Sequence, residues 1–175
     1  MNSGRRTSAR VEAGVSPACE STSQPAQLPL QKNKFTIRDA KLNDALGLAV
    51  LMCELGYDTT RAEMETRLKL VLSNPAYKTF VAVIDGCVCG MIGTITCANY
   101  EHNDPSGRIL ALVTLSASRR RGIGRALIAT AEKDFAQRGV TRVALNTQLT
   151  RDYAHKFYES LGYVRNGWRF VKQLQ

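Results

Sequence analysis

The chain has 175 residues, a hydrophobic fraction of 44%, a charged fraction of 22% and a formal net charge of +9. This length is typical of one globular domain, and no apolar run reaches the roughly 18 residues that span a bilayer. Four arginines crowd into positions 119–125, so the charge predicts a local anion site rather than a nucleic-acid-binding surface. The five cysteines lack the paired CxxC spacing of a zinc site. We therefore expect no metal, no membrane or nucleic-acid partner, and a reducing compartment such as the cytoplasm.

Residues 1–33 contain no aromatic residue and hold three of the five prolines. A segment of this composition cannot bury enough apolar surface to offset the entropy of ordering. We expect a disordered N-terminal extension over 1–33 and a folded domain over 34–175.

The first half of that domain reads as a strand, two helices and a hairpin. A short strand at 35–37 precedes a helix with apolar residues at helical spacing from Ala45 to Leu55. Thr60 and Glu63 form a capping box at the start of the next helix. Two β-rich runs, 79–84 and 87–98, flank Asp85-Gly86, which is a strong hairpin signal.

The second half alternates strands and helices. A buried strand at 109–115 precedes a helix from Ile123 to Phe135, followed by a strand at 143–145. A short helix begins at about Asp152, where His155 is expected on the exterior in a salt bridge, and strands at 163–164 and 168–171 end the chain. Hairpins followed by β-α-β crossovers predict an α/β fold with one mixed sheet of six to seven strands and helices on both faces.

The segment Arg119-Arg120-Arg121-Gly122-Ile123-Gly124, called the glycine loop below, joins a predicted strand to a predicted helix. The first N–H groups of a helix have no intrahelical partner, and glycine lets an anion approach the backbone closely. The glycine loop, with Arg125 beside it, therefore predicts a phosphate site. A Walker A pattern is absent, and a Rossmann pattern fails because its third glycine is missing. On these residues alone, an ordinary turn with solvated arginines stays open.

A second block, Ala154-His155-Lys156-Phe157-Tyr158-Glu159-Ser160-Leu161-Gly162-Tyr163, follows about 34 residues later. Together the two blocks resemble the GNAT superfamily of N-acetyltransferases, whose patterns are Arg/Gln-x-x-Gly-x-Gly/Ala and Ala-x-x-Phe-Tyr-x-x-x-Gly-Phe/Tyr. The resemblance covers roughly residues 34–173. It implies a GNAT-like fold and transfer of an acetyl group from acetyl-CoA to a primary amine by direct attack in a ternary complex. The acceptor can be a small molecule or a peptide, and a homodimer is a further family-based expectation.

The resemblance implies an acetyl-CoA site along one strand and the loop after it. Backbone groups of about Leu112, Val113 and Thr114 would pair with the pantetheine arm. The pyrophosphate would be held by the N–H groups and charges of Arg119, Arg120, Arg121, Gly122, Ile123, Gly124 and Arg125. Arg151 stands where many members carry an asparagine, and it is expected to contact a phosphate or to cap the helix.

Tyr158 matches the tyrosine that many members use as a general acid towards the CoA thiolate. A phenol keeps its proton at neutral pH, so this role is chemically reasonable. Members with a direct general base often carry a glutamate at the position of Leu110. Here the candidates are Glu101, His102 and Asp104 of the adjacent loop, together with a water chain ending at backbone carbonyls.

Substrate recognition in this family usually involves the first two helices and the loop after the third strand. Aromatic and acidic side chains suit a cationic amine, and the residues in these places are Glu54, Tyr57, Asp58, Tyr100, Glu101 and Asp104. The missing strand glutamate leaves one alternative, a catalytically inactive acyl-CoA-binding regulatory module.

Overall fold

The computed structural model describes residues 35–174, so the expectation for residues 1–33 lies outside the described part of the chain. In chain order the elements are β1 (Thr36–Asp39), a 3₁₀ turn η1 (Leu42–Asp44), α1 (Ala45–Glu54), α2 (Arg61–Ser73), β2 (Tyr77–Ile84), β3 (Cys87–Cys97), β4 (Ser106–Thr114), a 3₁₀ turn η2 (Ser116–Ser118), α3 (Ile123–Gln137), β5 (Arg142–Leu145) and α4 (Asp152–Glu159). No helix within these residues has the length and apolar content needed to cross a membrane.

The strands form one mixed sheet in the order β1-β2-β3-β4-β5. The first four are antiparallel neighbours, whereas β4 and β5 are parallel. The parallel pair follows from the connection, because a crossover through α3 returns the chain to the same end of the sheet. The mixed α/β sheet is thus as the sequence predicted.

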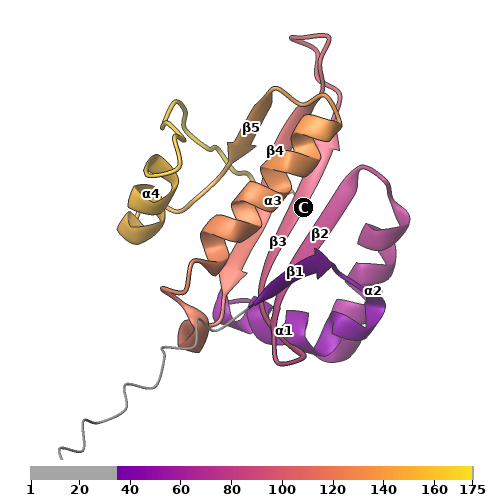
Figure 1. The fold of residues 1–175 in the computed structure, drawn as a ribbon. Helices are drawn as coiled ribbons and strands as arrows, with labels where there is room; N and C mark the ends of the chain where they lie inside the picture. The colour runs from indigo at the N-terminus through magenta and orange to yellow at the C-terminus, as the bar shows by residue number, and fades with distance from the viewer. Residues whose placement is uncertain (1–34, 175) are drawn as a thin grey trace, which may run out of the picture. The chain divides into compact units, whose positions relative to one another are not determined.

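Helices cover both faces of the sheet (Figure 1). Alternate residues of β2 separate the two cores: Phe80 and Ala82 pack with α3, and Val81 packs with α1 and α2. This alternation is the period of two of a strand that is buried on both sides. α3 contributes five buried side chains to its core, namely Ile123, Leu127, Ile128, Ala131 and Phe135.

Two local signals in the sequence are confirmed. Asp85 and Gly86 have φ angles of 49° and 80°, the two positive values that a tight hairpin turn requires. The capping box also forms: the Thr60 hydroxyl accepts from the Glu63 N–H at 3.3 Å, and the Thr60 N–H donates to the Glu63 carboxylate at 2.7 Å. Both features depend on residues within four positions of each other.

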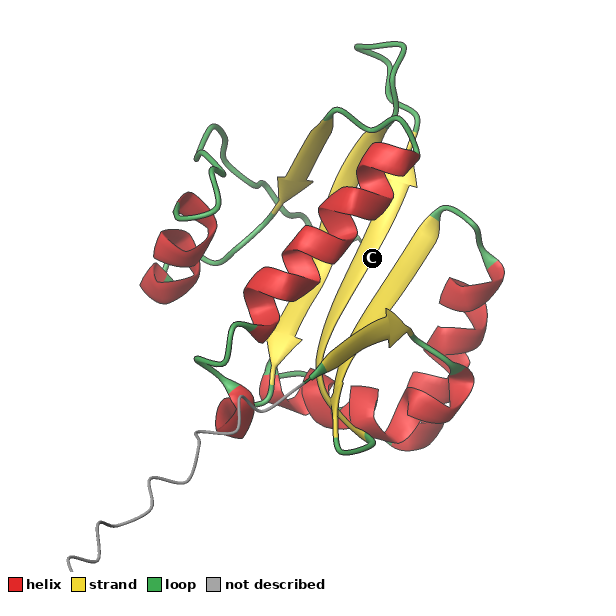
Figure 2. Ribbon diagram, viewed as in Figure 1, coloured by secondary structure: helices red, strands yellow, loops and turns green. Residues whose placement is uncertain are grey.

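The predicted number of strands is wrong, because the sheet formed by residues 35–174 has five strands rather than six or seven. Residues 163–164 and 168–171 are not in a strand, and Figure 2 shows the segment after α4 as loop. Trp168 and Phe170 are 80% and 92% exposed, so their β-favouring side chains have no packing partner in the described chain. Strand propensity reports how well a side chain fits a packed sheet, and it cannot supply the neighbouring strand.

Candidate functional site: an uncapped helix N-terminus beside an unpaired strand edge

β4 and β5 separate part-way along the sheet. Their pairing covers only Ser106–Ile109 of β4 against Arg142–Leu145 of β5. On its other side β4 stays paired with β3 as far as Thr114. The edge of β4 that faces β5 is therefore unpaired from Leu110 to Thr114 within the described chain. Alternate backbone N–H and C=O groups there can bind an extended ligand as a strand would.

The predicted Leu112, Val113 and Thr114 all lie on this open edge. Val113 is buried on the α1 and α2 side, and Leu112 packs partly against the α3 core. Their side chains thus belong to the two cores. Any contact with a ligand from these positions is made by the backbone.

The glycine loop follows β4 and η2, and it enters α3 through Gly122. Arg120 and Gly122 have φ angles of 63° and 82°, and such a conformation is uncommon for arginine. Gly122 is the N-cap of α3 and provides no side-chain hydrogen bond. The N–H groups of the first turn of α3, at Ile123, Gly124 and Arg125, therefore have no cap. This leaves the positive end of a 15-residue helix available to an anion.

Space is also open beside the loop. A Cβ built on Gly122 meets no atom within 4 Å, so an anion can approach the backbone there. Arg120 and Arg121 are exposed, and within the described chain neither forms an ion pair or a side-chain hydrogen bond. Both guanidinium groups are thus free to bind an anion.

The other two arginines of the region contact the protein. Arg119 forms an ion pair with Glu54 of α1 and donates from Nε to the Thr114 carbonyl at 3.4 Å. Arg125 donates to the Ser160 hydroxyl at 3.4 Å. Arg125 therefore joins the first turn of α3 to the end of α4.

The two sequence blocks meet in space. A Cβ on Gly124 would lie 3.4 Å from Cζ of Phe157, so the first turn of α3 is close to the Phe157-Tyr158 pair of α4. Tyr158 is half-buried, with its ring 5.2 Å from Phe157 and 5.8 Å from Tyr163, centroid to centroid, in edge-on contacts. No local spacing rule predicts this proximity, since about 30 residues separate the blocks.

Burial raises the pKa of the Tyr158 phenol, and the positive charge of Arg151 acts weakly in the opposite direction. Burial disfavours the phenolate because the charged form loses water. Within the described chain the Tyr158 hydroxyl forms no hydrogen bond. A protonated phenol therefore remains available to a group outside the protein.

Arg151 is the N-cap residue of α4, although its side chain makes no capping hydrogen bond. Its guanidinium instead donates to the Leu55 carbonyl at the end of α1, at 3.5 Å. This contact brings the turn over residues 55–60, called the α1–α2 turn below, close to α4. Tyr57 and Asp58 lie in this turn, and Tyr57 is 64% exposed.

The expected exterior position of His155 is wrong, because its side chain is only 9% exposed. Nε2 lies 3.0 Å from the Gln148 carbonyl, and Nδ1 lies 3.9 Å from the Asp152 carboxylate. The spacing from Asp152 places His155 on the helix, but it does not predict that Gln148 of the β5–α4 segment contacts the ring.

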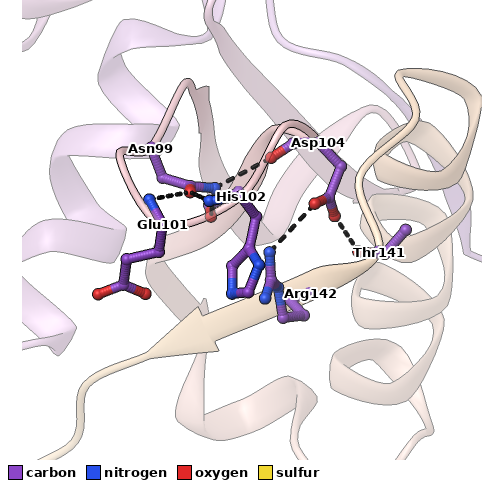
Figure 3. A network of polar contacts seen from close by, with 7 residues as sticks. Asn99, Glu101, His102, Asp104, Thr141 and Arg142 are labelled. Atoms are coloured by element: carbon purple, nitrogen blue, oxygen red, sulfur yellow. Dashed lines mark hydrogen bonds and ion pairs between the residues drawn. The ribbon is translucent and has the colours of Figure 1, made fainter.

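The loop between β3 and β4, which carries Tyr100, Glu101 and His102, lies at the opposite end of β4 from the glycine loop. Figure 3 shows the polar contacts of this loop. Asn99 organises it: its Oδ1 accepts from the N–H groups of Glu101 at 3.0 Å and His102 at 2.7 Å. All three predicted side chains, at 100–102, are exposed. Sequence reasoning missed Asn99, although an asparagine that bonds the backbone two residues on is a recognisable turn former.

Asp104 ties this loop to the start of β5. Its carboxylate accepts from the Thr141 hydroxyl and from Arg142 at 3.2 Å, and the Thr141 hydrogen bond, with the charge of Arg142, holds the Asp104 pKa below its ordinary value. The loop thus sits at the Ser106 end of β4, whereas the glycine loop follows Thr114. These ends are about 27 Å apart at about 3.4 Å per residue. The structure therefore does not bring Glu101, His102 or Tyr100 together with Tyr158.

Within residues 35–174, no group of three or more His, Cys, Asp or Glu side chains is placed to hold a metal ion. The candidate site thus consists of three parts: the glycine loop with the first turn of α3, the open edge of β4, and α4 with Tyr158. The α1–α2 turn adjoins them through Glu54 and Leu55.

Comparison with known proteins finds acetyltransferases. Over 143 residues the chain is 32% identical to an aminoalkylphosphonate N-acetyltransferase of Salmonella typhimurium, covering 79% of this chain and 90% of that protein. A solved putative acetyltransferase from Agrobacterium tumefaciens has a TM-score of 0.73 at 28% identity, covering 79% of this chain and 99% of the other. A GNAT family acetyltransferase from Staphylococcus aureus has a TM-score of 0.70 at 27% identity, covering 80% and 98%.

The model of the acetyltransferase (GNAT) family matches residues 48–163, which is more than half of the chain. The matched segment contains the glycine loop, the open edge of β4 and Tyr158. This chain belongs to the acetyltransferase (GNAT) family.

Proposed function

We propose that this acyltransferase moves an acetyl group from acetyl-CoA to a primary amine by direct attack in a ternary complex. The observation that carries the proposal is the meeting of three parts, namely the uncapped N-terminus of α3, the unpaired edge of β4 and the protonated Tyr158. Acetyl-CoA has chemistry that suits each part: an anionic pyrophosphate, an amide-containing arm and a thiolate leaving group.

The residues fit this co-substrate. The first N–H groups of α3 and the free guanidinium groups of Arg120 and Arg121 are proposed to bind the pyrophosphate. Backbone groups between Leu110 and Thr114 are proposed to pair with the pantetheine arm. Acetyl-CoA supplies an activated thioester carbonyl, and N–H groups on the same edge can stabilise negative charge that develops on its oxygen.

Tyr158 is proposed as the general acid. Its hydroxyl carries a proton at neutral pH and can donate it to the departing thiolate, which leaves as a neutral thiol. Loss of the acceptor amine's own proton is a separate step. Since the β3–β4 loop lies at the far end of β4, we favour water and the backbone carbonyls of the open edge over Glu101 and His102 for that step.

The acceptor is proposed to bind beside the α1–α2 turn, where Tyr57 and Asp58 provide an aromatic ring and a carboxylate for a cationic amine. The Salmonella relative is named for an amine that carries a phosphonate group. Small aminoalkylphosphonates therefore head the list of acceptors to test, followed by polyamines, aminoglycosides, amino acids and peptides.

A thiol-release assay with acetyl-CoA across this amine panel tests the proposal, with CoA binding measured separately by calorimetry. We expect CoA to bind and at least one primary amine to give amine-dependent thiol release. Tight CoA binding without turnover on the whole panel would instead favour the regulatory module, which Leu110 in place of a strand glutamate would suit. Absence of CoA binding would refute the proposed site itself.

A further inference from the structure

Two arginines from different elements converge on the last residues of α1. Arg119 of the glycine loop forms an ion pair with Glu54, the final residue of α1. Arg151, at the start of α4, donates to the carbonyl of the next residue, Leu55. The C-terminal end of a helix carries partial negative charge, so both contacts are electrostatically favourable. The end of α1 is thereby tied to the glycine loop after β4 and to the start of α4.

Arg119 makes a second contact besides the ion pair. Its Nε also donates to the Thr114 carbonyl, so the guanidinium bridges α1 and the last residue of β4. The Glu54 side chain is 23% exposed and that of Arg119 is 55% exposed. The ion pair therefore lies at the surface of the open edge, where ligands would enter, rather than inside a core.

The α1–α2 turn is held to both of its helices. The Gly56 N–H donates to the Cys53 carbonyl of α1 at 2.9 Å, and the Tyr57 N–H donates to the Met52 carbonyl at 3.0 Å. On the α2 side, Arg67 donates to the Thr59 hydroxyl at 3.0 Å, and the Thr60 capping box begins that helix. Tyr57 and Asp58 are exposed. The turn moves with α1, whose buried side chains pack on the sheet, and the Glu54–Arg119 pair and the Arg151 contact add direct links from the end of α1 to the glycine loop and to α4.

We propose that Glu54 is a positioning residue, which acts through Arg119 to hold the α1–α2 turn in register with the glycine loop. Arg119 then serves alignment of the two substrate sites, while Arg120 and Arg121 bind the anion. This inference rests on the proposed function, because it assigns the turn to the acceptor. An exposed ion pair adds only about 0–1 kcal/mol to stability, so its loss should alter alignment and leave the fold intact.

The test compares Glu54→Gln, Arg119→Gln and the double variant with the wild type. Glu65→Gln is the matched control, because Glu65 pairs with Arg61 within α2 and not with the glycine loop. The measurements are the CoA dissociation constant, kcat and KM for the best amine, and amide hydrogen exchange over residues 55–60. Exchange needs no acceptor, so this readout remains even if no amine is turned over.

We expect each single variant to raise the KM for the amine roughly fivefold and to speed exchange of the α1–α2 turn, and Glu54→Gln, which removes no group of the glycine loop, to change CoA affinity less than about twofold. The double variant should be no worse than Arg119→Gln alone, because that variant already removes the ion pair together with the hydrogen bond to Thr114.

Additive effects in the double variant, unchanged exchange over residues 55–60, or equal effects of Glu65→Gln would overturn the positioning role. These outcomes leave CoA binding intact. Failure of the wild type to bind CoA is a different result, and it would count against the proposed function rather than against the ion pair alone.

Discussion

Gly122 provides the sharpest test of the anion site, because the same substitution has a matched control at the other end of α3. Gly122 and Gly139 have φ angles of 82° and 75°, and a Cβ built on either meets no atom within 4 Å. Alanine at either position therefore costs only the left-handed backbone conformation, about 1 kcal/mol. For a domain of this size, that corresponds to a fall in Tm of about 3 °C.

The two variants should differ in ligand binding alone. In Gly122→Ala the new methyl group occupies the open space beside the first N–H groups of α3, where the pyrophosphate is proposed to lie. We expect CoA affinity to fall at least about tenfold, or about 1.4 kcal/mol, whereas Gly139→Ala should bind CoA as the wild type does. Calorimetry with CoA and thermal unfolding, run on the same samples, measure both quantities.

Wild-type CoA affinity in both variants would refute the placement of the pyrophosphate at Gly122. Equal losses in both would show that the effect is conformational. Gly124 is a poorer probe, because its Cβ would lie 3.4 Å from the Phe157 ring and larger side chains there would press on α4.

Tyr158→Phe should lower kcat by about 10²-fold with CoA affinity unchanged, whereas Tyr153→Phe, on the exposed side of the same helix, should have no effect; equal rates in the two variants would remove the acid role. Because burial raises the pKa of Tyr158, wild-type activity should not lose this acid until the pH passes the ordinary tyrosine value near ~10. His102→Gln and Glu101→Gln should each change turnover by no more than about twofold, as is usual for exposed positions away from a site, and a tenfold or larger loss would restore a base role to that loop. Asp44→Asn should lower the free energy of unfolding by about 2 kcal/mol, measured by urea titration at pH 7, because the buried Asp44 carboxylate accepts three hydrogen bonds. Since those bonds lower the pKa of Asp44, their stabilisation is present above the ordinary carboxyl value near ~3.9 and is lost as pH falls below it; a wild-type advantage that persisted undiminished at pH 2 would contradict this account.

Features carried by neighbouring residues could be predicted from the sequence. The Asp85-Gly86 turn, the Thr60 capping box and the glycine loop at the start of α3 each follow from backbone and side-chain preferences within a few positions. The apolar stripe of α3 likewise predicted its buried face, because helical spacing places those side chains on one side. The order of the elements and the mixed sheet followed from these local assignments.

Contacts between distant residues were decided only by the tertiary structure. The Glu54–Arg119 pair joins positions 65 residues apart, and no spacing rule predicts it. The strand-like residues after α4 remain unpaired in the described chain, because a strand also needs a neighbour. The Glu101 and His102 loop lies beside the predicted strand in sequence, yet it sits at the opposite end of β4 from the glycine loop, since a strand of nine residues separates its two ends by its full length. The sequence by itself thus determined the family and indicated segments of a candidate site, while packing of distant segments decided which of those segments meet.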